Sequence, residues 1–143
     1  MISELNQAKQ ALLSGGYTCV LCKEDATHVS NERGVKPLVA WLKSGVDFHG
    51  FSAADKVVGK GAAFLYILLG VRNVYAQVIS KPALTLLQEH KIRVEYDTKV
   101  EYIVNRRGDG FCPFEVAVME ISDPQTAYLA ICKKMEELKI YLS

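Results

Sequence analysis

Three short segments of this chain carry residues whose types and spacing could do chemistry. The first, Phe51–Leu69, opens polar and closes almost wholly apolar, over a length typical of one helix. Ser52 followed three residues later by Asp55 is typical of a capping box, which predicts a helix start at this point. In this prediction Asp55 and Lys56 lie at the N-terminus of a buried helix. Charges at such an N-terminus are a common way to build a ligand site.

The other two segments also precede predicted helices. Ser80 and Lys81 stand directly before Pro82, and Gly108-Asp109-Gly110 leads to Cys112-Pro113. Two glycines before a helix N-terminus can form a backbone nest that holds an anion, and a plain turn is the alternative. A thiol at a helix start has a lowered pKa, which makes Cys112 a candidate nucleophile. Glu115 is equally well explained as a capping carboxylate.

We expect these segments to meet in one cleft, because ligands of open α/β sheets gather beyond the carboxyl ends of parallel strands. The predicted lining is Ser52, Asp55, Lys56, Ser80 and Lys81, with Asp109, Cys112 and Glu115 on the rim and Arg33 and Lys36 closing the far side. Lysines beside helix N-termini favour an anionic ligand such as a phosphate or a carboxylate. The alternative is that Ser52 and Asp55 only cap a helix while both lysines point into solvent.

Neither a metal nor another cofactor is predicted. Cys19 and Cys22 have the spacing of a zinc knuckle, but residues three apart on a strand point to opposite faces. Cys112 and Cys132 stand alone, and His28, His49 and His90 are scattered. Two further functions stay open. One is a metal-independent enzyme with Asp55 as acid or base, Lys56 or Lys81 as the anion-binding group and Cys112 as nucleophile. The other is a structural or oligomerisation module.

Prolines and glycines predict the elements that must position these residues. Helices are expected to begin near Pro37, Pro82, Pro113 and Pro124 and to end at Ser44, His90, Met119 and Leu138, after a first helix over 2–13. Tyr17–Cys22 and Ala26–Ser30 predict a hairpin, while Val74–Ile79 and Ile92–Tyr96 predict parallel strands. Residues 96–104 either hold a further strand, Val100–Val104, or begin a helix.

This order predicts one α/β domain over residues 1–143, a three-layer α/β/α sandwich with a mixed sheet. The helix over 53–69 should be central, so that Gly59-Lys60-Gly61 falls inside it and forms no phosphate loop. The side chains expected in the core are Val57, Val58, Phe64, Leu65, Leu68, Val74, Ala76, Val78, Leu86 and Leu87.

Composition limits the partners. A net charge of +1 makes nucleic acid an unfavoured partner, and the longest apolar run, Gly61–Val71, is too short to span a membrane. The polar N-terminal residues do not resemble a signal peptide. We expect a cytoplasmic protein with reduced cysteines and a small-molecule ligand. Assembly into a homo-oligomer stays open.

Four segments, Glu32–Leu38, Gly50–Lys60, Val78–Leu84 and Asn105–Glu115, resemble an uncharacterised prokaryotic family, a domain of unknown function within the cytidine-deaminase-like fold. The resemblance implies that fold and places Ser52–Lys56 beside Ser80–Pro82. Zinc deaminases carry His or Cys, Ala and Glu at the first helix start and Pro-Cys-x-x-Cys at the second. This chain has Ser52-Ala-Ala-Asp55 and Ser80–Leu84 there. We therefore expect a metal-free deaminase scaffold that binds a small anionic or nucleotide-like ligand and does not deaminate cytidine.

Overall fold

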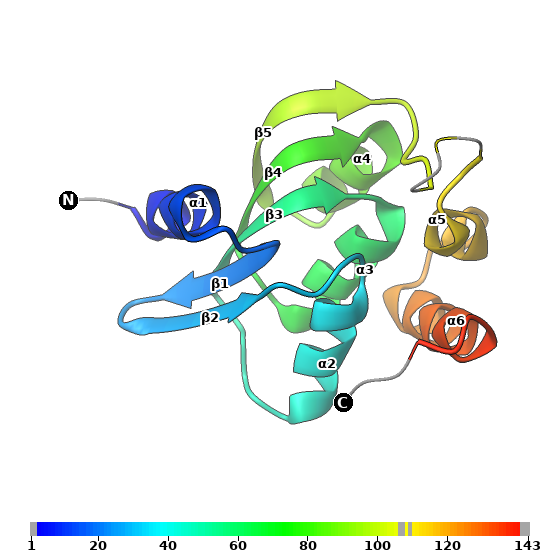
Figure 1. Cartoon of the computed structure of the whole chain (residues 1–143), viewed down its shortest axis with the longest axis horizontal. Helices are drawn as coiled ribbons and strands as arrows, with labels where there is room; N and C mark the ends of the chain where they lie inside the picture. Colours follow the sequence, from blue (N-terminus) through cyan, green and yellow to red (C-terminus); the bar gives the residue numbers. More distant parts are fainter. Residues whose placement is uncertain (1–2, 106–107, 109, 141–143) are drawn as a thin grey trace.

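A computed structural model describes residues 3–105, 108 and 110–140. Eleven elements follow one another along the chain (Figure 1): α1 (Glu4–Gly15), β1 (Cys19–Lys23), β2 (Ala26–Ser30), α2 (Lys36–Ser44), β3 (Ser52–Val58), α3 (Lys60–Leu69), β4 (Asn73–Ser80), α4 (Lys81–Glu89), β5 (Arg93–Val100), α5 (Pro113–Val118) and α6 (Pro124–Glu137). The proline-led helix starts are confirmed, and Asp123 caps α6 by accepting a hydrogen bond from the Thr126 N–H at 2.9 Å. None of the described helices is long and apolar enough to cross a membrane.

The strands form one mixed sheet in the order β2-β1-β3-β4-β5. The predicted hairpin is confirmed, since β1 pairs antiparallel with β2, and β1 also pairs antiparallel with β3. The three remaining strands β3, β4 and β5 run parallel. Neither alternative for residues 96–104 is correct, because β5 continues to Val100 and Val104 forms only an isolated bridge with Phe111.

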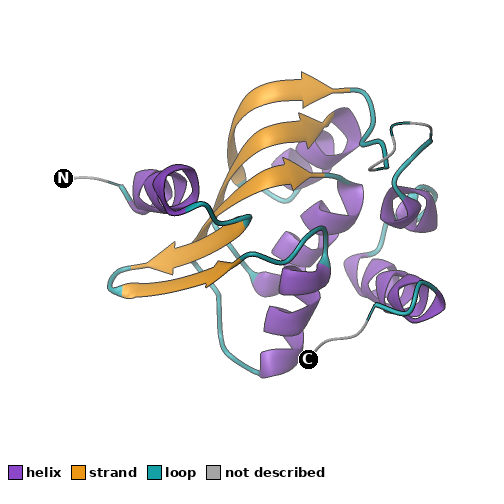
Figure 2. Cartoon of the chain, viewed as in Figure 1, coloured by secondary structure: helices purple, strands orange, loops and turns teal. Residues whose placement is uncertain are grey.

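Helices cover both faces of the sheet, although unevenly (Figure 2). The crossover helices α3 and α4 pack against each other on one face, because right-handed crossovers that progress in one direction along a sheet fall on the same side. α5 and α6 pack on the outside of α3. On the opposite face α1 is the helix that contacts β1, β3 and β4 within the described part of the chain. In this α/β/α arrangement α1, and not a crossover helix, covers the second face.

The core divides between these two faces. Under α1 lies a small cluster of Ala8, Leu12, Val20, Cys22, Ala54 and Tyr75, while the larger cluster includes Cys19, Ala53, Phe64, Tyr66 and Ile131. Cys19 and Cys22 thus point to opposite faces of β1, as the strand geometry predicts. All four cysteines are free thiols.

The segment Phe51–Leu69 is not one helix but a strand followed by a helix. Ser52–Val58 is the central strand β3, and α3 begins only at Lys60, after the N-cap Gly59. Ladders to β1 and β4 on both sides, and small side chains that let α1 and the α3 layer approach β3, outweigh the local capping signal. The predicted core is otherwise largely buried, with Leu68 and Val78 half-buried. Val57 is 46% exposed and Val58 is fully buried, so the alternation that turns Ala53 and Asp55 to the larger core breaks off at the end of β3.

Candidate functional site

The carboxyl edge of the parallel strands gathers most of the chemically capable residues. β3 leads to Gly59-Lys60, β4 to Ser80-Lys81, and β5 to Glu101-Tyr102. The residues that follow β2 reach the same edge, since the hydroxyl of Thr18 donates to the Glu32 carbonyl at 2.6 Å and the Lys56 N–H donates to the Thr18 carbonyl at 3.3 Å. Ligands of open α/β sheets collect at this edge.

A hollow of about 540 Å³ opens at this edge, between α4 and the segments that follow β5 and α5. We call it the lysine hollow, because Lys60 and Lys81, the first residues of α3 and α4, both line it. Its complete lining is Lys60, Lys81, Pro82, Thr85, Leu86, Glu89, His90, Glu101, Tyr102, Ile121 and Ser122. Two consecutive crossover helices thus each deliver one cation to the same space.

The two lysines differ in how firmly they are held. The Lys60 ammonium donates to the Met119 carbonyl at 3.0 Å and lies 5.6 Å from the centre of the Phe64 ring. Lys81 makes no hydrogen bond or ion pair with another described residue, so its charge is available to a ligand. Ser80, by contrast, is fully buried and caps α4 by accepting from the Ala83 N–H at 3.2 Å. Ser80 therefore positions Lys81 rather than meeting a ligand.

Glu115 clamps α5 to the start of α3. One of its carboxylate oxygens accepts from the Lys60 N–H at 2.8 Å and the other from the Gly61 N–H at 2.9 Å. These are two of the N–H groups that an α-helix leaves unpaired at its start. Gly59 permits this approach, because a Cβ at that position would lie 2.5 Å from the carboxylate. Gly59-Lys60-Gly61 is thus a helix start and not a helix interior, and Glu115 caps α3 instead of its own helix.

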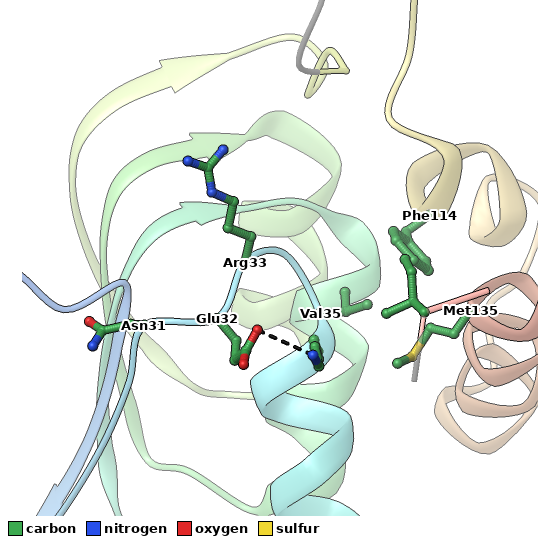
Figure 3. Close-up of a pocket in the computed structure, with 8 residues that line it drawn as sticks. Asn31, Glu32, Arg33, Val35, Phe114 and Met135 are labelled. Carbon is green, nitrogen blue, oxygen red and sulfur yellow. Dashed lines mark ion pairs between the residues drawn. The ribbon is translucent and has the colours of Figure 1, made fainter. Parts of the chain in front are cut away.

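Arg33 and Lys36 line a second hollow, of about 380 Å³, together with Phe114 and Met135. Figure 3 shows the loop before α2 on one side of this space and side chains from α5 and α6 on the other. The Lys36 ammonium pairs with the Glu32 carboxylate at 3.3 Å. Neither Arg33 nor Lys36 lines the lysine hollow, so they do not close the far side of one common cleft.

Asp55 belongs to a buried chain of three titratable groups. The Tyr66 hydroxyl donates to the Asp55 carboxylate at 2.6 Å, and the Cys19 sulfur lies 3.1 Å from the same hydroxyl. Burial raises the pKa of Asp55 to about 7. The hydrogen bonds from Tyr66 and from the backbone lower this pKa, but they offset only part of the rise. Burial, followed by the nearby charge of Asp55, raises the pKa of both Cys19 and Tyr66 well above their usual ranges.

These positions weaken the enzyme hypothesis. Asp55 is 7% exposed, lies under α3 and lines neither hollow, so it has no access to a substrate there. Cys112 is the N-cap of α5, and burial and the charge of Glu115 raise its pKa, whereas we expected a helix start to lower it. Lys56 is exposed on β3. Asp109 lies outside the described residues.

The prediction that all these residues line one cleft is most clearly wrong for Ser52. In the parallel register Ser52 faces Asn73 at the start of β4, while Ser80 faces Val100 at its end. Ser52 and Ser80 therefore lie at opposite edges of the sheet, and Ser52 accepts a hydrogen bond from the Asn73 side chain at 2.9 Å. A third hollow, of about 560 Å³, lies at that amino edge and mixes Arg72 and Arg93 with Glu4 and Glu95.

Sequence reasoning missed Lys60, Glu101 and Tyr102 as lining residues. The available signal was Gly59-Lys60-Gly61, which marks a strand-to-helix junction once Ser52–Val58 is assigned to a strand. Among the described residues there is no group of three His, Cys, Asp or Glu side chains that could hold a metal ion. The charged groups that the described part of this edge offers a ligand are lysines and glutamates.

The protein is an α/β domain with a five-stranded mixed sheet and a hollow at its carboxyl edge that two lysines and two glutamates line. Residues 7–135 match the model of the Domain of unknown function (DUF1893), and the chain belongs to this family. It is similar to the crystal structure of a DUF1893 family protein (TM1506) from Thermotoga maritima, with a TM-score of 0.85 and 29% sequence identity over 94% of this chain and 92% of that one. A comparison with curated proteins gives no significant match.

Proposed function

We propose that this domain binds a small anionic ligand, a phosphate or carboxylate compound, in the lysine hollow. The observation that carries the proposal is the convergence of Lys60 and Lys81 on one space at the carboxyl edge of the sheet. A free ammonium is a good partner for a phosphate or carboxylate oxygen, and charge-assisted hydrogen bonds of this kind are about twice as strong as neutral ones. Lys81, which lacks a partner among the described residues, is the primary contact.

The remainder of the hollow can accommodate a larger organic group that carries the anion. Glu89 lies eight positions after Lys81 on α4, which is roughly 12 Å along a helix, so the cationic and acidic parts of the wall are separated. Glu101 and Glu89 can accept hydrogen bonds from hydroxyl or amino groups, and Tyr102, which is 55% exposed, offers an aromatic face. A volume of about 540 Å³ is that of an ordinary small-molecule site. A nucleotide-like compound combines these groups.

We also propose that the fold is cytidine-deaminase-like but carries no zinc deaminase chemistry. Support comes from the order of a hairpin, then parallel strands joined by crossover helices. The two helix starts are Lys60-Gly61-Ala62 and Lys81-Pro82-Ala83, and neither contains the imidazole, thiolates or glutamate that the zinc mechanism uses. Free thiols support the proposed cytoplasmic location.

Calorimetric titration tests the ligand proposal with inorganic phosphate, pyrophosphate and a panel of nucleoside monophosphates as probes. We expect at least one probe to bind wild type and Lys81→Ala to weaken that binding by about tenfold or more. Lys133→Ala, an exposed lysine on α6, is the matched control and should bind as wild type does. Lys60→Ala should also weaken binding, with an added loss of stability from its Met119 contact. Equal binding by Lys81→Ala and Lys133→Ala, or no binding to any probe, would refute the proposal.

A further inference from the structure

The outer edge of β5 is an unpaired strand edge. β5 is eight residues long and pairs with β4 on one side, and the described chain places no strand on its other side. Its sequence, Arg-Val-Glu-Tyr-Asp-Thr-Lys-Val, contains no proline, and most of its side chains are exposed. An edge of this length offers a row of free N–H and C=O groups to a further strand.

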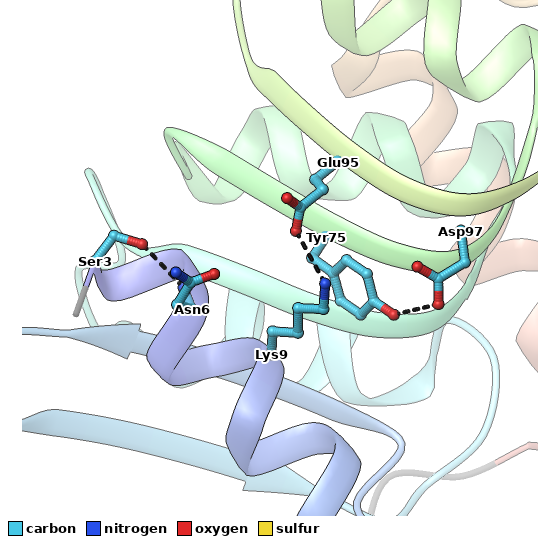
Figure 4. Close-up of polar contacts among 6 residues, drawn as sticks. All are labelled: Ser3, Asn6, Lys9, Tyr75, Glu95 and Asp97. Carbon is cyan, nitrogen blue, oxygen red and sulfur yellow. Dashed lines mark hydrogen bonds and ion pairs between the residues drawn. The ribbon is translucent and has the colours of Figure 1, made fainter.

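The two faces of β5 differ in chemistry. The Lys9 ammonium of α1 pairs with Glu95 at 3.4 Å, and the Tyr75 hydroxyl donates to Asp97 at 2.6 Å, so these charged side chains lie on the α1 face (Figure 4). Strand alternation places Arg93 and Lys99 on the same face. The other face carries Val94, Tyr96, Thr98 and Val100, which are residues that favour strands.

We propose that β5 pairs antiparallel with β5 of a second copy of this chain, with the two Asp97 residues opposite each other at the twofold axis. A twofold interface joins the same patch of both subunits, so the strand must complement itself. The charge order of this edge, positive at Arg93, negative at Glu95 and Asp97 and positive at Lys99, decides which register does so.

Pairing in a register centred on Tyr96 is electrostatically unfavourable, because it places Arg93 opposite Lys99 and Glu95 opposite Asp97, each twice. Like charges directly opposite on a sheet destabilise the pairing. A register centred on Thr98 places Asp97 opposite Lys99 twice, which is attractive, but it also places Glu95 opposite Glu101 twice, which is repulsive. The charges therefore favour neither neighbouring register.

The register centred on Asp97 instead places Glu95 opposite Lys99 within β5, and Arg93 opposite Glu101, the bend residue that directly follows β5, each twice. Only the Asp97 pair at the axis is like-charged. On the other face Val94 meets Val100 and Tyr96 meets Thr98, and all four side chains lack a formal charge. The second copy's Arg93 also comes beside Glu101, which lines the lysine hollow.

Sedimentation of the full-length protein at low ionic strength tests this interface. We expect a dimer, and we expect Lys99→Glu to raise its dissociation constant by about tenfold or more, because two attractive pairs become repulsive. The charge swap Glu95→Lys with Lys99→Glu should restore the dimer, and Lys133→Glu on α6 should leave it unchanged. Wild type that sediments as a monomer, or Lys99→Glu that dimerises as wild type does, would overturn the proposal.

Cysteine cross-linking tests the register separately. In a background with Cys112→Ser and Cys132→Ser, the substitutions Tyr96→Cys, Asp97→Cys and Thr98→Cys are introduced singly and oxidised. We expect disulfide-linked dimers chiefly from Asp97→Cys, because only position 97 faces its own copy. Cross-linking that peaks at position 96 or 98, or that is equal at all three, would overturn the assigned pairing.

Discussion

Replacing Asp55 with asparagine should make the protein more stable at alkaline pH. The buried carboxyl meets the Tyr66 hydroxyl and backbone N–H groups, and Tyr66 in turn meets Cys19, so no cation of the described residues balances its charge when it ionises. Asparagine has nearly the same shape and stays neutral at every pH. Its amide can donate to the Tyr66 oxygen while its carbonyl accepts from the backbone, provided that the Tyr66 hydroxyl then donates to Cys19.

The size and sign of the effect follow from proton linkage. Burial raises the pKa of Asp55 from 3.8 to about 7, a rise of about three units, and at 1.36 kcal/mol per unit this corresponds to about 4 kcal/mol of folding free energy. Because the folded pKa is raised, this stability is fully present below pH 3.8 and is lost as the pH rises to about 7. In Asp55→Asn the group no longer titrates, so this loss is absent.

Urea unfolding of wild type and Asp55→Asn at several pH values from about 4 to 8 measures the effect. The free energy of unfolding of wild type minus that of the variant should fall by roughly 1.4 kcal/mol per pH unit up to pH 7 and then level off. Wild type and the variant share all their other titrating groups, so the contributions of those groups to the pH dependence cancel in this difference. Asp25→Asn, at an exposed carboxylate in the turn between β1 and β2, is the control and should track wild type. Parallel pH profiles for wild type and Asp55→Asn would refute the reasoning.

Two further predictions concern α5. Glu115→Ala and Gly59→Ala should each lower the free energy of unfolding by about 1–2 kcal/mol, the size of a lost helix cap. The double variant should cost little more than either single one, because both remove the same clamp, and full additivity in urea unfolding would contradict this. Cys112 should react with iodoacetamide at pH 7 more slowly than a free cysteine, since burial and Glu115 raise its pKa. Mass spectrometry measures the rate of this reaction. A faster reaction than that of a free cysteine would contradict the prediction and make Cys112 a candidate nucleophile again.

The sequence by itself determined the elements whose signals are local. Pro37, Pro82, Pro113 and Pro124 mark four helix starts, because a missing N–H matters least in the first turn. Alternating and β-branched runs gave the hairpin and both later parallel strands. Lys81 was correctly placed beyond the end of a parallel strand, since that position follows from the order of strand and helix alone.

Only the tertiary structure decided the centre of the molecule. Ser52–Val58 carries a capping signal and small residues that suit a helix, and it becomes a strand because β1 and β4 pair with it from both sides. That change moves Ser52 to the far edge of the sheet and buries Asp55 beside Tyr66. The hydrogen bonds that Glu115 accepts from the N–H groups of Lys60 and Gly61 join residues far apart in the chain. No local pattern encodes such pairings, because they depend on which strands and helices become neighbours when the chain folds.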